Sequence, residues 1–156
     1  METANIKTPL GIAKIIGDEN GISEISVFDE GQVSSKIPTV LQNSVSQLQD
    51  YFDGKRNDFT FQLHPKGTDF QQRVWQELLK IPFGKTISYM DLSKKLGDVK
   101  AIRAVASANG KNPLWIVVPC HRVIGTDGSL TGYAGGLWRK KWLLEHENPS
   151  NQQSLF

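Results

Sequence analysis

The sequence predicts a two-domain α/β (α+β) protein, in which a small α/β domain, residues 1–65, precedes a mostly helical domain, residues 66–147. Strand-like alternation and turn residues dominate the first part, whereas apolar residues recur at helical spacing in the second. The charge also changes sign: residues 1–65 hold 5 basic and 9 acidic residues, and residues 66–147 hold 13 and 7. Residues 148–156 carry no charge and are expected to form a flexible tail.

Composition excludes several classes of protein. The 156 residues are 38% hydrophobic and 22% charged, as in globular proteins. The apolar runs are too short for a membrane span, and the N-terminus lacks the features of a signal peptide, so we expect a cytoplasmic protein. The single cysteine, Cys120, cannot form an internal disulfide, and three distant histidines do not indicate a metal site. The basic second part favours a polyanionic partner, although a solvated basic face would show the same asymmetry.

The acidic first part is expected to form a β-hairpin, a helix and a further strand. Residues 10–16 and 22–28 alternate as strands on either side of a turn. Residues 31–36 are polar and form either a loop or a short third strand. Apolar residues recur at helical spacing over 41–52, and residues 58–63 alternate again as a strand. No reactive combination of side chains occurs in this part of the chain.

The basic part begins with three predicted helices. Thr68 and Gln71 form a capping box for the first, and Ser88 and Asp98 are caps for the next two. Two short helices joined by the glycine-containing turn at Gly97 make a helix-turn-helix. The exposed face of its second helix carries a long cation among small side chains, which suits close approach to nucleic acid: Arg103, Ala104, Ala106, Ser107 and Lys111. An ordinary helical hairpin with a solvated arginine is the alternative.

The only cysteine lies where a predicted strand ends. Residues 116–118 are apolar and β-branched, which indicates a buried strand, and Pro119 should end it. His121 and Arg122 follow Cys120, and both can favour a thiolate. The alternative is a free buried cysteine, the commonest state of a lone cysteine.

A catalytic cysteine needs a base, and His121 is the nearest candidate in the sequence. Adjacent side chains of an extended strand point to opposite faces, so either the backbone turns after the proline or a water relays the proton. We expect the relay. Glu147 is the expected acceptor for the histidine, because it shares the core-facing side of a final helix, residues 137–146, with Leu143 and Leu144. A solvated carboxylate at a frayed helix end is the alternative.

Six short motifs follow one another in the second part of the chain. They are residues 83–89, 103–105, 112–113, 119–123, 132–136 and 142–144, and the fourth reads Pro-Cys-His-Arg-Val. Together they resemble the O6-alkylguanine-DNA alkyltransferases, a family that repairs alkylated DNA by moving the alkyl group to a cysteine of the enzyme itself. Several ordered motifs at natural spacing match by chance far less often than one pentapeptide.

This resemblance implies a single-turnover transfer that needs no cofactor. Cys120 would accept the alkyl group of O6-alkylguanine, and also of O4-alkylthymine. His121, a water and Glu147 would form the proton relay, and Asn112 would brace the turn before the cysteine. Tyr89 would rotate the phosphate of the target nucleotide and donate a proton to the base.

The resemblance also implies how DNA is handled. A monomer would bind double-stranded DNA through the minor groove, and Arg103 would fill the gap left by the flipped base. The substrate pocket would be lined by Val123, Tyr133, Ala134 and Gly135. Some members have a serine where this chain has Ala134, so only the backbone N–H could reach the base oxygen here. Some members carry zinc in their ribonuclease-H-like N-terminal domain, but this chain lacks the cysteines for it, and His64 is expected to be metal-free.

Two other functions remain as alternatives. A non-catalytic lesion binder of the alkyltransferase-like kind resembles this chain but replaces the cysteine, so Cys120 argues against it. A cysteine hydrolase would need an oxyanion hole and repeated turnover, and it would leave the helix-turn-helix unexplained.

Overall fold

The computed structural model describes residues 1–133 and 135–149, so Ala134 and most of the predicted tail lie outside the described residues. The chain divides into two compact units. Unit 1 comprises residues 1–66 and 113–117, and unit 2 comprises residues 67–112 together with the chain from residue 118 onward. Within the described residues, every helix is too short or too polar to cross a membrane.

Unit 1 is built on an antiparallel sheet of three strands in the order β1–β2–β3. The strands are β1 (Glu2–Thr8), β2 (Gly11–Asp18) and β3 (Gly21–Phe28). The predicted hairpin is therefore confirmed as β2 and β3, whereas β1 was not predicted. Small and large buried residues pair across β1 and β2, with Ala4 opposite Ile15 and Ile6 opposite Ala13, so one face of the sheet is evenly filled.

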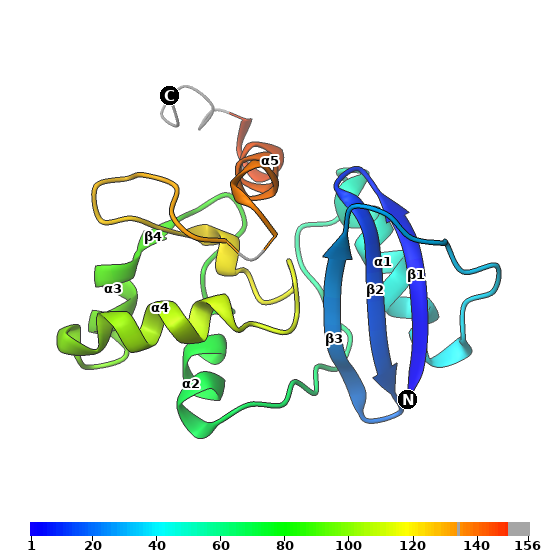
Figure 1. Cartoon of the computed structure of the whole chain (residues 1–156), viewed down its shortest axis with the longest axis horizontal. Coiled ribbons are helices and arrows are strands. Elements are labelled where there is room, and N and C mark those ends of the chain that lie inside the picture. Colours follow the sequence, from blue (N-terminus) through cyan, green and yellow to red (C-terminus); the bar gives the residue numbers. More distant parts are fainter. Residues whose placement is uncertain (134, 150–156) are drawn as a thin grey trace. The chain divides into compact units, whose positions relative to one another are not determined.

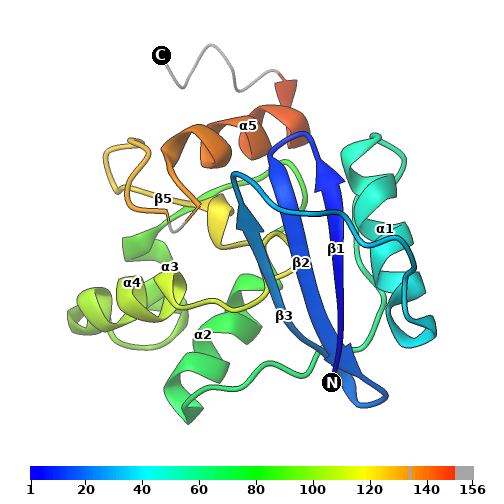
Figure 2. The same ribbon diagram turned by 45° about the vertical axis from the view of Figure 1, so that its right-hand side comes forward.

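One helix covers a face of this sheet (Figures 1 and 2). A short 3-10 helix, η1 (Thr39–Leu41), leads into α1 (Gln42–Phe52), which confirms the helix predicted from its apolar spacing. The buried apolar residues of this helical segment are Leu41, Val45, Leu48 and Tyr51, and they form the core of unit 1 with the inner residues of the sheet. Residues 31–36 form a loop, in which Ser34 N–H donates to Asn5 O at 2.8 Å.

The strand predicted at residues 58–63 is wrong. The segment makes one isolated bridge, between Leu63 and Ile22 of β3. The buried side chain of Gln47 explains the difference, because its amide accepts from Thr60 N–H at 2.9 Å and donates to Thr60 Oγ1 at 2.8 Å. A side chain of α1 therefore holds this extended backbone where a neighbouring strand would otherwise do so.

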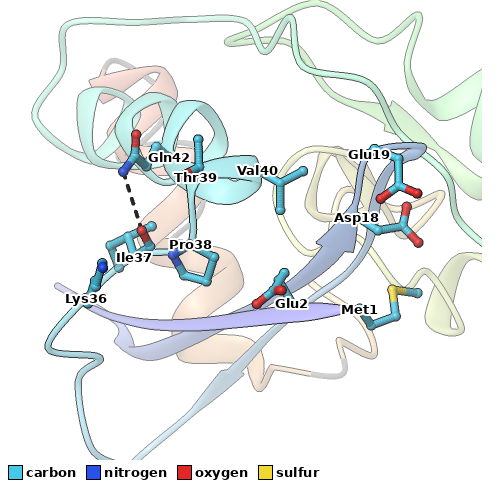
Figure 3. Close-up of a pocket in the computed structure, with 10 residues that line it drawn as sticks. All are labelled: Met1, Glu2, Asp18, Glu19, Lys36, Ile37, Pro38, Thr39, Val40 and Gln42. Carbon is cyan, nitrogen blue, oxygen red and sulfur yellow. Dashed lines mark hydrogen bonds between the residues drawn. The ribbon is translucent and has the colours of Figure 1, made fainter.

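A pocket of about 650 Å³ lies on unit 1 (Figure 3). It is lined by the start of β1, the β2–β3 turn and the segment that enters α1. Three carboxylates, those of Glu2, Asp18 and Glu19, lie along it with the ammonium of Lys36. This acidic lining, on the acidic unit, does not favour contact with phosphates.

The described residues of unit 2 form short helices and one two-stranded sheet. The helices are α2 (Asp69–Leu78), α3 (Tyr89–Lys95), η2 (Val99–Ala101), α4 (Ile102–Gly110), η3 (Cys120–Arg122) and α5 (Leu137–Glu147). The strands β4 (Ile87–Ser88) and β5 (Val123–Ile124) pair in parallel. The fold class predicted from the sequence is confirmed, with a sheet-based first unit and a mostly helical second unit.

Local capping sets the helix starts of unit 2. Thr68 and Gln71 form the complete capping box of α2, and the side chains of Ser88 and Asp98 cap α3 and η2. Gly97, between them, has φ +89°, a conformation that glycine adopts without strain. Near the end of α2, Trp75 is buried, whereas Leu79 is exposed. The Trp75 indole donates to Ala108 O at 2.9 Å and so joins α2 to α4.

The buried strand predicted at residues 116–118 is also wrong. These residues are buried, but the backbone turns: Ile116 has φ +71°, and Val117 N–H donates to Trp115 O at 2.9 Å. The carbonyl of Val118 accepts from the side chain of Asn112 at 2.7 Å and from Cys120 N–H at 2.8 Å. Local turns and one side-chain amide therefore take the place of a strand partner for Val117 N–H and Val118 O.

Candidate functional site

The cysteine lies in a turn that is held from both ends. Cys120 begins the 3-10 helix η3, and the carbonyl of Val118, two residues earlier, accepts from the side chain of Asn112. Directly after η3, Val123 of β5 pairs with Ile87 of β4, and β4 leads into Tyr89 at the start of α3. The parallel β4–β5 pair therefore connects the backbone of the cysteine turn to that of Tyr89.

Cys120 and His121 lie in this turn and not in an extended strand, where their side chains would point to opposite faces. His121 is fully buried, and its Nε2 lies 2.8 Å from Glu147 Oε2. Within residues 1–133 and 135–149, its other ring nitrogen, Nδ1, makes no hydrogen bond, so it does not bond directly to the thiol. Cys120 is 8% exposed.

Arg122 shares the same carboxylate. Its Nε and Nη2 donate to the two oxygens of Glu147 at 2.7 and 3.0 Å, and its Nη1 donates to Ile81 O at 2.7 Å. Its guanidinium carbon also lies 5.8 Å from the centre of the Phe83 ring. This bidentate pair fixes the orientation of Glu147, whose side chain is only 1% exposed.

The C-terminal end of α5 lies against Gly84. Gly84 has φ +79°, and a Cβ atom placed there would lie 3.2 Å from Glu147 O. The side chain of Asn148 donates to Gly84 O at 3.1 Å. A glycine at this turn therefore allows the last turn of α5, with Glu147, to come close.

Charge states follow from these contacts. Burial alone would raise the pKa of Glu147, but the charge and hydrogen bonds of His121 and Arg122 hold this pKa well below the ordinary carboxyl range. Burial lowers the pKa of His121, only partly opposed by Glu147. At neutral pH the histidine is therefore uncharged. Since Nε2 donates to a carboxylate, Nδ1 is left as the basic nitrogen.

The thiol is surrounded by groups that favour its ionised form. Burial raises the pKa of Cys120 above that of a free thiol. The side chain of Asn112, the positive charge of Lys140 and the side chain of Tyr133 lower the pKa of this thiol and so act in the opposite direction. The site therefore combines a shielded sulfur with several groups that stabilise the thiolate.

Lys140 is a site residue that the sequence did not single out. It lies on α5, is 0% exposed, and its Nζ donates to Thr131 O at 2.9 Å. Burial lowers its pKa to about 8, against the opposing effect of Cys120, so the amine remains mostly protonated at neutral pH. A buried ammonium whose charge acts on Cys120 is an electrostatic aid to thiolate formation.

Replacing Lys140 with methionine, which keeps the length and removes the charge, is expected to raise the pKa of the Cys120 thiol. The rate at which Cys120 reacts with an alkyl electrophile at neutral pH should then fall by about tenfold, and the loss should shrink as the pH rises. The measurement is the rate of Cys120 alkylation as a function of pH. Lys141→Met is the control, because Lys141 forms a surface pair with Glu145 at 3.9 Å. An unchanged pH profile in Lys140→Met would contradict the electrostatic role.

Tyr89 is a further titratable residue that interacts electrostatically with Cys120. It is the first residue of α3, and its hydroxyl oxygen accepts from Asn109 Nδ2 at 3.3 Å. Burial raises the pKa of Tyr89, the nearby Thr131 and Asn109 side chains lower it, and the charge of Cys120 raises it further. The phenol is therefore protonated at neutral pH and can act as a proton donor.

Apart from Tyr89, which is half-buried, the residues predicted to contact DNA are exposed on the helix-turn-helix formed by α3 and α4. Arg103, Ala104, Ala106 and Ser107 of α4, and Lys111 directly after it, are all exposed, whereas Val105 and Ala108 are buried. Of the predicted pocket residues, Val123 is buried, the Tyr133 side chain lowers the pKa of the Cys120 thiol, and Gly135 is half-buried. The fourth, Ala134, lies outside the described residues.

Comparison with known proteins places both parts of the chain in one family. Residues 69–149 match the DNA binding domain of 6-O-methylguanine DNA methyltransferase, and residues 2–65 match its ribonuclease-like domain. The chain belongs to the 6-O-methylguanine DNA methyltransferase family.

Relatives resemble this methyltransferase chain over nearly its whole length. The methylated-DNA--protein-cysteine methyltransferase of Methanosarcina barkeri is 42% identical over 149 residues, which are 91% of this chain and 94% of that protein. A probable enzyme of the same name from Acanthamoeba polyphaga mimivirus is 46% identical over 153 residues, 97% of this chain and 100% of the relative. The crystal structure of Mycobacterium tuberculosis OGT in complex with DNA is 41% identical, with a TM-score of 0.87, and covers 96% of this chain and 94% of that one.

Proposed function

We propose that this protein repairs DNA directly by transferring an alkyl group from O6-alkylguanine to Cys120, once per molecule. The observation that carries the proposal is a buried cysteine beside a histidine–glutamate pair, in a chain that belongs to a methyltransferase family. The same chemistry applies to O4-alkylthymine, since an alkyl carbon on an exocyclic oxygen is again the electrophile. No cofactor is needed, because the displacement requires only a nucleophile, a base and a proton donor.

The thiol first loses its proton. We assign His121 Nδ1 as the base, because Nε2 is engaged with Glu147 and Nδ1 has no hydrogen-bond partner among the described residues. A water relays the proton between Cys120 and this nitrogen. Glu147 then stabilises the imidazolium, and Arg122 keeps the carboxylate ionised and in place.

The thiolate then attacks the alkyl carbon in line with its bond to the base oxygen. The new carbon–sulfur bond forms as the carbon–oxygen bond breaks, and the electron pair returns to the base. Tyr89 donates the proton that neutralises the base, since its phenol is protonated at neutral pH. Asn112 braces the turn at Val118. The thioether product is not readily hydrolysed, which accounts for a single turnover.

DNA reaches this site through residues 66–147, which we propose as the DNA-binding alkyltransferase domain. The exposed small side chains of α4 fit a minor groove, and Arg103 fills the space left by the extruded base. The protein acts as a monomer. The pocket around the base includes Val123, Tyr133, Ala134 and Gly135. The presence of Cys120 disfavours a purely non-catalytic lesion binder.

Arg103→Ala tests how substrate is presented. The inserted side chain offsets part of the unstacking cost, so repair of duplex O6-methylguanine should slow by about tenfold. Reaction with free O6-benzylguanine, which needs no base flipping, should change by less than about twofold. The measurement is the pair of second-order rate constants for each variant.

Two variants serve as controls for Arg103→Ala. Arg103→Lys keeps the charge but lacks the planar group that stacks, so it should restore duplex repair only in part. Tyr89→Phe should slow both reactions, because it removes the proton donor that both substrates need. Equal losses on both substrates for Arg103→Ala would show that Arg103 serves the pocket or the fold.

A further inference from the structure

The side chain of Asn109 is a buried polar group to which the mechanism above gives no role. It lies in the last turn of α4, and the residue is 3% exposed. Its amino group donates to the Tyr89 hydroxyl at 3.3 Å. Its carbonyl oxygen, Oδ1, is buried and has no hydrogen-bond partner within the part of the chain that the structure describes. Only the amino group of this buried amide makes a hydrogen bond, and its partner is the proposed proton donor. Buried polar atoms usually have partners, so this arrangement needs a physical reason.

The backbones on both sides of this contact are fixed. On α4, Ala108 O accepts from the Trp75 indole at 2.9 Å. On α3, Tyr89 O accepts from the Ser93 hydroxyl at 2.9 Å. Three residues after Asn109, the Asn112 side chain holds the cysteine turn. The end of α4 therefore supports two functional groups, the phenol through Asn109 and the thiol turn through Asn112.

We infer that Asn109 is a positioning residue that directs the hydroxyl proton of Tyr89 toward the substrate base. This inference rests on the proposed function. A phenol hydrogen prefers the plane of its ring, on one of two sides. An N–H donor on one side is attracted to the oxygen lone pair and repels a hydrogen on that side. The amide of Asn109 therefore leaves the hydrogen on the side away from α4, where it is available for donation.

The opposite orientation of the amide would have the opposite effect. If Oδ1 faced the phenol, it would accept the phenol hydrogen and withdraw it from the base. An aspartate at this position offers only acceptors, whereas a leucine of similar size offers neither donor nor acceptor. The two variants thus separate the donating role of the amide from its contribution to packing.

The test compares Asn109→Leu, Asn109→Asp and Tyr89→Phe in second-order transfer from duplex O6-methylguanine and from free O6-benzylguanine. We expect Tyr89→Phe to be about 100-fold slower and Asn109→Leu about tenfold slower on both substrates. Asn109→Asp should be slower than Asn109→Leu, because its carboxylate captures the phenol hydrogen. Thermal denaturation identifies the variants that remain folded at the assay temperature.

The decisive comparison is the double variant Tyr89→Phe with Asn109→Leu. If Asn109 acts through the phenol, adding Asn109→Leu to Tyr89→Phe should change the rate by less than about twofold. A further tenfold loss in that background would overturn the inference, since it would show a role in packing or DNA binding. Asn109→Asp as fast as the unaltered protein would also overturn it. If the unaltered protein transferred no alkyl group, the proposed function itself would fail.

Discussion

Replacement of Cys120 with serine is expected to lower alkyl transfer by at least about 10³-fold while the fold persists. A serine hydroxyl has nearly the size of a thiol but ionises far less readily and is a much weaker nucleophile. The surrounding turn depends on the side chain of Asn112 and on backbone groups, and not on the sulfur. Binding of lesion-containing DNA should therefore be largely retained.

The measurement for Cys120→Ser combines three assays: methyl loss from a duplex, duplex binding, and thermal denaturation. Cys120→Ala is the matched control, because it removes the nucleophile without adding a hydroxyl. Methyl loss at the normal rate in either variant would mean that another group accepts the alkyl group.

Glu147→Gln is expected to have two separate effects. Transfer should slow by about 10- to 100-fold, because the imidazolium formed at His121 loses its stabilising charge. Stability should fall by about 3 kcal/mol, because the buried guanidinium of Arg122 loses its ionic partner. The loss of rate should exceed any loss of DNA affinity, since the pair is buried, whereas the predicted DNA contacts of α4 are exposed.

The lowered pKa of the Glu147 carboxyl predicts how the stability of the unaltered protein depends on pH. Its folded-state pKa lies below the unfolded value of about 4.3, so its contribution to stability is present above that value. This contribution is lost as the pH falls through the lower folded-state pKa. Acid unfolding of the unaltered protein should therefore show a component that Glu147→Gln lacks.

Glu145→Gln is the matched control on the same helix. Its carboxylate pairs with Lys141 at 3.9 Å near the surface, so the change should cost less than about 1 kcal/mol and leave the rate unchanged. Transfer rates are compared at a temperature where both variants are folded. Equal rates for Glu147→Gln and Glu145→Gln, with His121→Ala also unimpaired, would exclude the proposed relay.

The helices were largely predictable because their signals are local. The capping box of Thr68 and Gln71 and the caps at Ser88 and Asp98 involve residues only two or three positions apart. Strands were harder, because apolar alternation predicts burial but not the hydrogen-bond partner. The buried segment at 116–118 is a turn supported by Asn112, and the segment at 58–63 is held by Gln47.

The candidate site was predictable in part for the same reason. Helical spacing places Glu147 on the core side of α5. Lys140, seven residues before Glu147, lies on the same core-facing side of α5. Helical spacing could therefore have predicted its burial as well. The bidentate contact of Arg122 and the contact of Asn109 join residues 25 and 20 positions apart, and only the folded chain shows them.

Intact mass spectrometry after incubation with duplex DNA containing O6-methylguanine tests the central claim most directly. We expect each protein molecule to gain the mass of one methyl group, located at Cys120 by peptide mapping, and to gain no more with longer incubation. The duplex should lose one methyl group for each protein molecule modified. Repeated loss of methyl groups from the duplex without a mass change, or a methyl group at any other residue, would contradict transfer to Cys120.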